Sequence, residues 1–119
     1  MKIGAQGEID AASYLERRGY RILSKNFTCK QGEIDLIAYR DDTICFVEVK
    51  SRRNMRYGRP SEAVTANKQA HIRQTASYFL FSRWNKLPVH EKTCFRFDVI
   101  EVFYEDGKAR VECIENAFC

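Results

Sequence analysis

The chain has 119 residues, of which 45% are hydrophobic, 30% are charged and two are prolines, and its formal net charge is +4. This length suits one domain with a single core, and the composition excludes disordered and fibrous proteins. No apolar run approaches the ~18 residues that span a bilayer, and Glu8 and Asp10 interrupt the start of the chain, where a signal peptide would be apolar. We therefore expect one cytoplasmic domain over residues 1–119, with no membrane contact.

The first half of the sequence predicts one helix and then three strands. Residues 4–18 are rich in helix formers, with Ala5, Glu8, Ala12 and Leu15 on one stripe, and Gly19 follows where a helix would end. Residues 20–28, 32–39 and 43–50 are rich in β-branched and aromatic side chains. Three strands in succession favour a meander.

The second half predicts a second helix and two more strands. A helical pattern starts near residue 60 or 65, with Ser61 or Thr65 as the N-cap, and runs to about residue 84. Its apolar stripe consists of Ile72, Ala76, Phe79 and Leu80. Residues 93–104 then alternate Phe95, Phe97 and Val99 against Arg96 and Asp98, and a turn at residues 106–107 leads into a last strand at 109–114. The predicted order is α-β-β-β-α-β-β, an α/β fold.

The charge distribution indicates a kind of partner, and the cysteines indicate the redox state of the chain. From residue 98 onward there are six acidic and two basic residues, a net of −4, which leaves +8 on the first 97 residues. A polyanionic partner for that part is plausible. The five cysteines are odd in number and contain no C-x-x-C pair, so we expect reduced thiols rather than disulfides or a zinc site.

Charged residues continue an apolar row in the third predicted strand. A period of two places Ile44, Phe46, Glu48 and Lys50 on one face. If residues 41–42 form a symmetric turn, paired positions sum to 83, and Asp35 lies directly opposite Glu48. Two facing carboxylates repel each other, and a divalent cation such as Mg²⁺ relieves that repulsion because it prefers oxygen ligands. Lys50 would orient or deprotonate a water beside the metal.

Two further observations bear on this site. Glu8 shares its stripe with Ala12 and Leu15 and so could reach the metal from the first helix, although a helix-start glutamate in solvent fits the spacing as well. An E-x-K sequence at a strand end is itself more often a solvated face than a site. The metal-site hypothesis therefore depends on the register, which a three- or five-residue turn would break.

A basic segment follows directly after the third strand. Residues 50–59 contain five cations, no acid and Tyr57, a composition typical of phosphate contact with base stacking. The candidate nucleic-acid-binding residues, including one on the second helix, are Arg52, Arg53, Arg56, Arg59 and Lys68. The alternative is an ordinary solvated loop.

These residues resemble the bacterial YraN-like family over residues 4–118. The resemblance is carried by Glu8, by GEIDLI at 32–37, by FVEVKSR at 46–52, by RFDV at 96–99 and by the end of the chain. That family is similar to the restriction-endonuclease-like, PD-(D/E)xK nucleases, including archaeal Holliday-junction resolvases and the tRNA-endonuclease catalytic domain. Ile34 stands where that motif has a proline, a common departure.

The resemblance implies a mixed β-sheet flanked by helices and a nuclease site. It makes Asp35 and Glu48 the metal ligands, Lys50 the catalytic lysine and Glu8 an additional carboxylate. We therefore expect a nucleic-acid-binding endonuclease that depends on Mg²⁺ or Mn²⁺, with DNA as its main substrate. Related folds often lose their chemistry, so two alternatives stay open: a slow or inactive nucleic-acid-binding module, and an interaction protein with a structural ion-pair network.

The late aromatic residues raise the question of assembly. Cutting two strands favours two copies related by a two-fold axis, and the similar resolvases act as dimers. The large aromatics that would mark an interface if exposed are Phe79, Phe81, Trp84, Phe95, Phe103 and Phe118. The alternative is that they fill the core.

Overall fold

The computed structural model describes residues 3–52 and 64–118 and contains the elements in the predicted order. Helix α1 (Ile3–Arg17) precedes the strands β1 (Arg21–Cys29), β2 (Gly32–Arg40) and β3 (Thr43–Arg52). Helix α2 (Ala66–Arg83), the short 3₁₀ helix η2 (Trp84–Lys86), β4 (Cys94–Glu105) and β5 (Lys108–Phe118) follow. No helix in the described part of the chain is long and apolar enough to cross a membrane.

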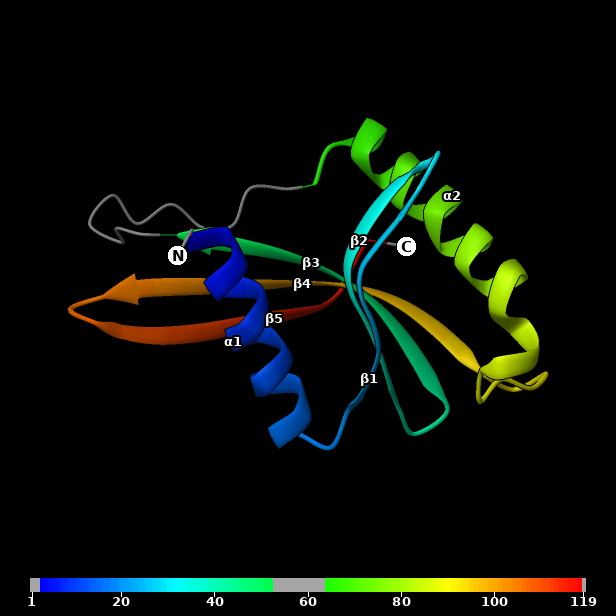
Figure 1. Cartoon of the computed structure of the whole chain (residues 1–119), viewed down its shortest axis with the longest axis horizontal. Helices are drawn as coiled ribbons and strands as arrows, with labels where there is room; N and C mark the ends of the chain where they lie inside the picture. The colour runs from blue at the N-terminus through cyan, green and yellow to red at the C-terminus, as the bar shows by residue number, and fades with distance from the viewer. Residues whose placement is uncertain (1–2, 53–63, 119) are drawn as a thin grey trace.

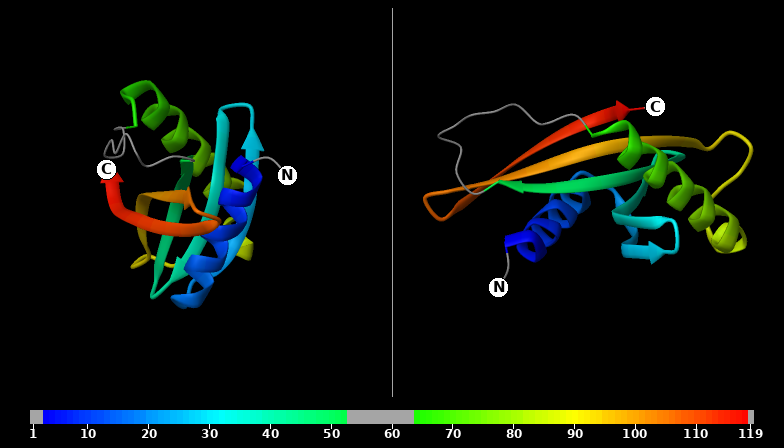
Figure 2. Two further views of the ribbon diagram at one scale, coloured as in Figure 1. Left: turned by 90° about the vertical axis from the view of Figure 1, so that its left-hand side faces the viewer. Right: turned by 90° about the horizontal axis from the view of Figure 1, so that it is seen from above.

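The strands form one mixed sheet in the order β1-β2-β3-β4-β5. The first three strands are an antiparallel meander, as expected, β4 lies parallel to β3, and β5 returns antiparallel to β4. A parallel pair needs a crossover, which is the connection that contains α2. This is the helix-flanked mixed sheet that the resemblance implied (Figures 1 and 2).

Two apolar clusters cover the two faces of the sheet. One joins α1 to the sheet through Ala11, Leu15, Leu36 and Val47, and the other joins α2 to it through Phe46, among other residues. The α2 side includes the predicted stripe members Ile72, Ala76 and Phe79. Thr65, one of the two predicted caps, accepts a hydrogen bond from the Lys68 amide at 3.1 Å.

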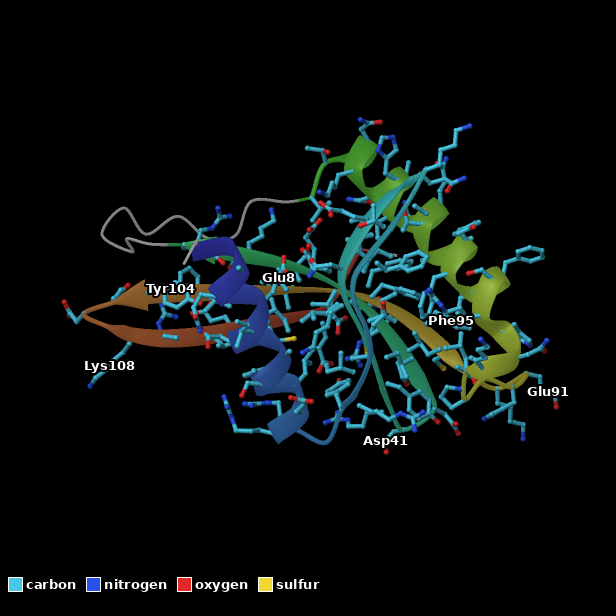
Figure 3. All side chains as sticks on the ribbon, viewed as in Figure 1. Glu8, Asp41, Glu91, Phe95, Tyr104 and Lys108 are labelled. Atoms are coloured by element: carbon cyan, nitrogen blue, oxygen red, sulfur yellow. The ribbon has the colours of Figure 1, made fainter. Side chains whose placement is uncertain are left out.

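Helix α1 lies very close to β3. A Cβ atom on Gly7 would come within 1.9 Å of the Ser51 hydroxyl oxygen, so glycine permits this approach. At the side of β4, the Tyr104 hydroxyl donates to Asp10 at 2.6 Å and ties the helix to the sheet (Figure 3). Ala5, predicted on the buried stripe, is exposed because it lies beyond the part of α1 that the sheet covers.

The late aromatics divide into two groups. Phe79, Phe103 and Phe118 are buried, whereas Phe81, Trp84 and Phe95 are exposed, Phe81 by 86%. Only half of the expected interface set therefore lies at the surface. The described cysteines, residues 29, 45, 94 and 113, are free thiols, of which Cys45 is buried as a small hydrophobe and Cys94 is exposed.

Candidate metal centre

A two-residue turn sets the register of β2 and β3. Asp41 and Asp42 both have left-handed backbones, with φ of 50° and 57°, as a type I′ hairpin turn requires. The pairs run from Arg40 with Thr43 to Leu36 with Val47, and every pair sums to 83. The predicted register is confirmed, and its next step places Asp35 opposite Glu48.

The two strands separate at this point. The β2–β3 pairing ends with Leu36 and Val47, beyond which β2 continues toward α2 while β3 runs on beside β4 (Figure 1). The Val49 amide, which faces the departing strand, donates instead to Asp35 Oδ2 at 2.8 Å. We call this place, defined by Asp35 and Glu48, the fork.

The two fork carboxyl groups are close enough to affect each other directly, so they lie on one side of the sheet. Burial, together with the neighbouring Glu48 carboxyl group, raises the pKa of Asp35 to about 7, against the opposing effects of the Val49 amide and the Lys68 ammonium. Two facing carboxylates in a partly buried place cannot both ionise without cost. Near neutral pH the fork therefore readily holds or releases one proton.

The neighbouring cation comes from α2. Lys68 Nζ lies 3.2 Å from Glu48 Oε2, with the Glu48 side chain 14% and the Lys68 side chain 48% exposed. Lys68 lies in the first turn of α2, which Thr65 caps. Sequence reasoning assigned Lys68 to nucleic-acid contact, and its pairing with Glu48 was not anticipated because it depends on how α2 packs.

Glu8 approaches from the other face. It is half-buried, lies beyond the first turn of α1 (Figure 3), and lines a cavity with Lys25, Asn26 and Leu36. Burial raises its pKa, the charge of Asp35 raises it further, and a hydrogen bond from the Asn26 side chain lowers it. The electrostatic coupling between Glu8 and Asp35 links α1 to the fork.

The donor set of the fork fits a hard divalent cation. A carboxylate pair that holds one proton can exchange that proton for a metal, and Mg²⁺ is commonly held by one or two carboxylates plus water and substrate phosphate. Across residues 3–52 and 64–118, no three His, Cys, Asp or Glu side chains are grouped closely enough to hold a metal ion. Asp35 and Glu48 would therefore be its protein ligands, with Glu8 further away.

The remaining predicted residues of β3 lie on the same face as Glu48. Lys50 follows two positions after Glu48, is half-buried, and pairs in register with Glu101 of β4. Arg52 Nη2 lies 3.6 Å from Oε2 of Glu101, a carboxylate that is 98% buried. Arg52 thus has a structural neighbour in addition to any phosphate. The predicted contacts Arg53, Arg56 and Arg59, with Tyr57, fall outside the described residues.

A second charged cluster was missed by the sequence analysis. Asp98 is 1% exposed and accepts three hydrogen bonds from Arg96 at 2.9–3.2 Å. It also accepts from the Asn116 amide at 2.8 Å, and Arg96 donates to the Tyr20 hydroxyl at 2.7 Å. The alternating pattern of β4 separates Arg96 and Asp98 from the aromatic residues but does not indicate that their side of the sheet is buried.

Comparison with known proteins places the chain in a family. The model of Uncharacterised protein family UPF0102 matches residues 7–102. UPF0102 proteins of Caldicellulosiruptor saccharolyticus and Syntrophomonas wolfei are 42% and 43% identical to this chain, covering 98% of it and 97% of their own lengths. One from Clostridium botulinum is 47% identical, over 98% of this chain and 93% of its own. The chain belongs to the UPF0102 family, the YraN-like family that its motifs resembled.

Proposed function

We propose that this chain is a metal-dependent nuclease that binds nucleic acid, DNA foremost, and hydrolyses phosphodiester bonds with Mg²⁺ or Mn²⁺. The observation that carries the proposal is the carboxyl pair of Asp35 and Glu48, which face each other where β2 and β3 separate. A pair of this kind, with a pKa near neutrality, is typical of a functional site rather than of a stabilising one.

The metal would supply charge neutralisation at the phosphate and an acidified water. Asp35 and Glu48 would hold it, and Asp35 would release its proton as the metal binds. Lys50, on the same face of β3 as Glu48, would orient the attacking water or stabilise charge that develops on the phosphate. These roles need both carboxylates on one face, which the register provides.

Lys68 would change partners when a metal ion binds. It faces Glu48 at 3.2 Å, where it offsets the charge of the acidic pair. A metal ion between the carboxylates would take over that neutralisation, and the half-exposed ammonium would then be available to a phosphate oxygen. This arrangement couples α2 to substrate binding.

Two other functions are compatible with the fold. A nucleic-acid-binding module with an inactive site would bind Mn²⁺ and nucleic acid without cleavage. An interaction protein with a structural ion-pair network would bind neither. The second alternative accounts for the pairing of Lys68 with Glu48, but it does not explain why a second buried carboxyl group, Asp35, lies beside that pair.

The test is a cleavage panel of branched, nicked, flapped, linear and single-stranded DNA, together with RNA, in Mg²⁺ and in Mn²⁺. We expect cleavage of at least one substrate, loss of cleavage in Glu48→Ala, and full activity in Glu105→Ala, which changes an exposed glutamate at the end of β4. Cleavage that persists in Glu48→Ala would contradict the proposal, as would no cleavage of any substrate. Calorimetric titration with Mn²⁺ then separates the inactive module, which binds, from the ion-pair network, which does not.

A further inference from the structure

Asn26 has a left-handed backbone inside strand β1. Its φ is 53°, in a region that residues other than glycine rarely adopt. The flanking residues are paired, Lys25 with Leu36 and Phe27 with Ile34, so Asn26 lies across from Asp35. A strained backbone beside a candidate metal ligand needs a physical reason, because such strain persists only where the surroundings maintain it.

The β1–β2 hairpin reverses its faces at this position. Residues two apart in a regular strand share a face, yet Leu36 belongs to the cluster beneath α1 and Ile34 to the cluster beneath α2. On β1, Lys25 lines a cavity beside α1, while Phe27 packs with the residues of α2. The reversal falls at Asn26 on one strand and at Asp35 on the other, next to the place where β2 leaves β3.

The same backbone conformation accompanies a contact to Glu8. Asn26 and Glu8 line one cavity of about 220 Å³, with Ala5, Ile9, Lys25 and Leu36 as the other lining residues. The Asn26 side chain is also near enough to the Glu8 carboxylate to lower its pKa. Since Glu8 also feels the charge of Asp35, this amide is the polar link between β1 and the α1 carboxylate at the fork.

We propose that Asn26 is a positioning residue, whose left-handed backbone opens the fork and whose amide holds the Glu8 carboxylate beside Asp35. The inference rests on the proposed function in one respect, namely that Glu8 contributes to a metal site. Asparagine meets both demands at once: glycine would allow the backbone but lacks the amide, and aspartate would allow the backbone but set a second carboxylate against Glu8.

The first test separates backbone from amide. Asn26→Gly keeps the left-handed backbone and removes the contact, and its matched control is Asn116→Gly, at an equally left-handed position of β5 where the backbone amide that binds Asp98 is retained. We expect both variants to melt at or above the wild-type temperature. Mn²⁺ affinity should fall about tenfold to a hundredfold in Asn26→Gly alone. Unfolding of Asn26→Gly, or unchanged affinity, would overturn the inference.

The second test asks whether Asn26 acts through Glu8. In a Glu8→Gln background, Asn26→Gly should lower Mn²⁺ affinity much less than it does in wild type, because each of the two changes disrupts the same contact between Asn26 and Glu8. Fully additive losses would mean that Asn26 acts by another route.

A third measurement needs no metal. The side-chain amide resonances of Asn26 should shift in Glu8→Gln and stay in place in Glu16→Gln, which alters an exposed glutamate of the same helix. If they do not respond to Glu8→Gln, the inference fails whatever the metal result. If they respond but wild type binds no Mn²⁺, the proposed function fails and the positioning contact stands.

Discussion

Two carboxylates of the same sheet lie in opposite electrostatic situations. Asp98 accepts three hydrogen bonds from Arg96 and one from the Asn116 amide, and its charge raises the pKa of Arg96 further. Asp35 has one backbone donor, the Val49 amide, and a second acid, Glu48, beside it. Burial and the neighbouring Glu48 together raise the pKa of Asp35 to about 7. One carboxylate is fully compensated, and the other is not.

The position of each residue in the sheet explains the difference. Asp98 pairs in register with Val47 of β3, and an irregularity in the β4–β5 pairing at this position lets the Asn116 amide donate to its side chain. Asp35 lies where β2 has just left β3, and one backbone amide, that of Val49, donates to it there. A compensated buried pair holds the fold together, whereas an uncompensated buried carboxyl group is a candidate for chemistry.

The largest effect should come from Asp98→Ala. It leaves the Arg96 guanidinium in a partly buried place without its main partner, and we expect the free energy of unfolding in urea to fall by about 3–5 kcal/mol. Metal binding by the protein that remains folded should be unchanged. A loss below about 1 kcal/mol would show that the ion pair of Asp98 with Arg96 does not stabilise the fold.

Glu48→Gln should show the opposite profile. We expect Mn²⁺ affinity to fall at least about a hundredfold, which corresponds to about 2.8 kcal/mol, with a change in unfolding free energy below about 1 kcal/mol. Isothermal titration and urea denaturation measure the two quantities. Glu105→Gln, at the exposed end of β4, should alter neither the Mn²⁺ affinity nor the stability. A large stability loss with retained Mn²⁺ binding would show that Glu48, like Asp98, stabilises the fold and does not bind metal.

Asp35→Asn should stabilise the metal-free protein at alkaline pH. Because the folded-state pKa of Asp35 lies above its ordinary 3.8, the contribution of this group to stability is fully present below pH 4 and is lost as the pH rises through about 7. The neutral amide avoids that loss, so we expect a gain of about 1–2 kcal/mol at pH 8 that disappears near pH 4. Melting curves across this range measure it, and a destabilised variant at pH 8 would contradict the assigned cause.

Local patterns in the sequence account for the register of the fork. Strand periodicity and two adjacent aspartates suited to a turn placed Asp35 opposite Glu48, and the structure has that register. Both signals act over a few residues, so they could be read without knowledge of the packing. The stripe of α1 likewise indicated that Glu8 faces inward, although the two ends of that stripe differ in burial.

Other features depend on contacts between distant elements. The pairing of Lys68 with Glu48 follows from the packing of α2, and the left-handed Asn26 follows from the reversal of the β1–β2 hairpin. The burial of Asp98 could not be predicted, because alternation reveals which residues share a side of a strand but not whether a helix covers that side. Its hydrogen bond with the Asn116 amide, 18 residues away, gives no local signal.

The smallest effect on stability should come from Lys68→Gln. Half of the Lys68 side chain is exposed, so its contact with Glu48 is worth only about 0.5 kcal/mol, well below a buried pair such as Arg96 with Asp98. If Lys68 contacts a phosphate once metal occupies the fork, the variant should lower the salt slope of nucleic-acid binding by about one unit. Lys108→Gln, at the β4–β5 turn, removes the same charge at the far end of the sheet (Figure 3) and should leave the slope unchanged. Equal slopes in both variants would restrict Lys68 to neutralising Glu48, whereas a stability loss above about 2 kcal/mol would make that pair a structural one.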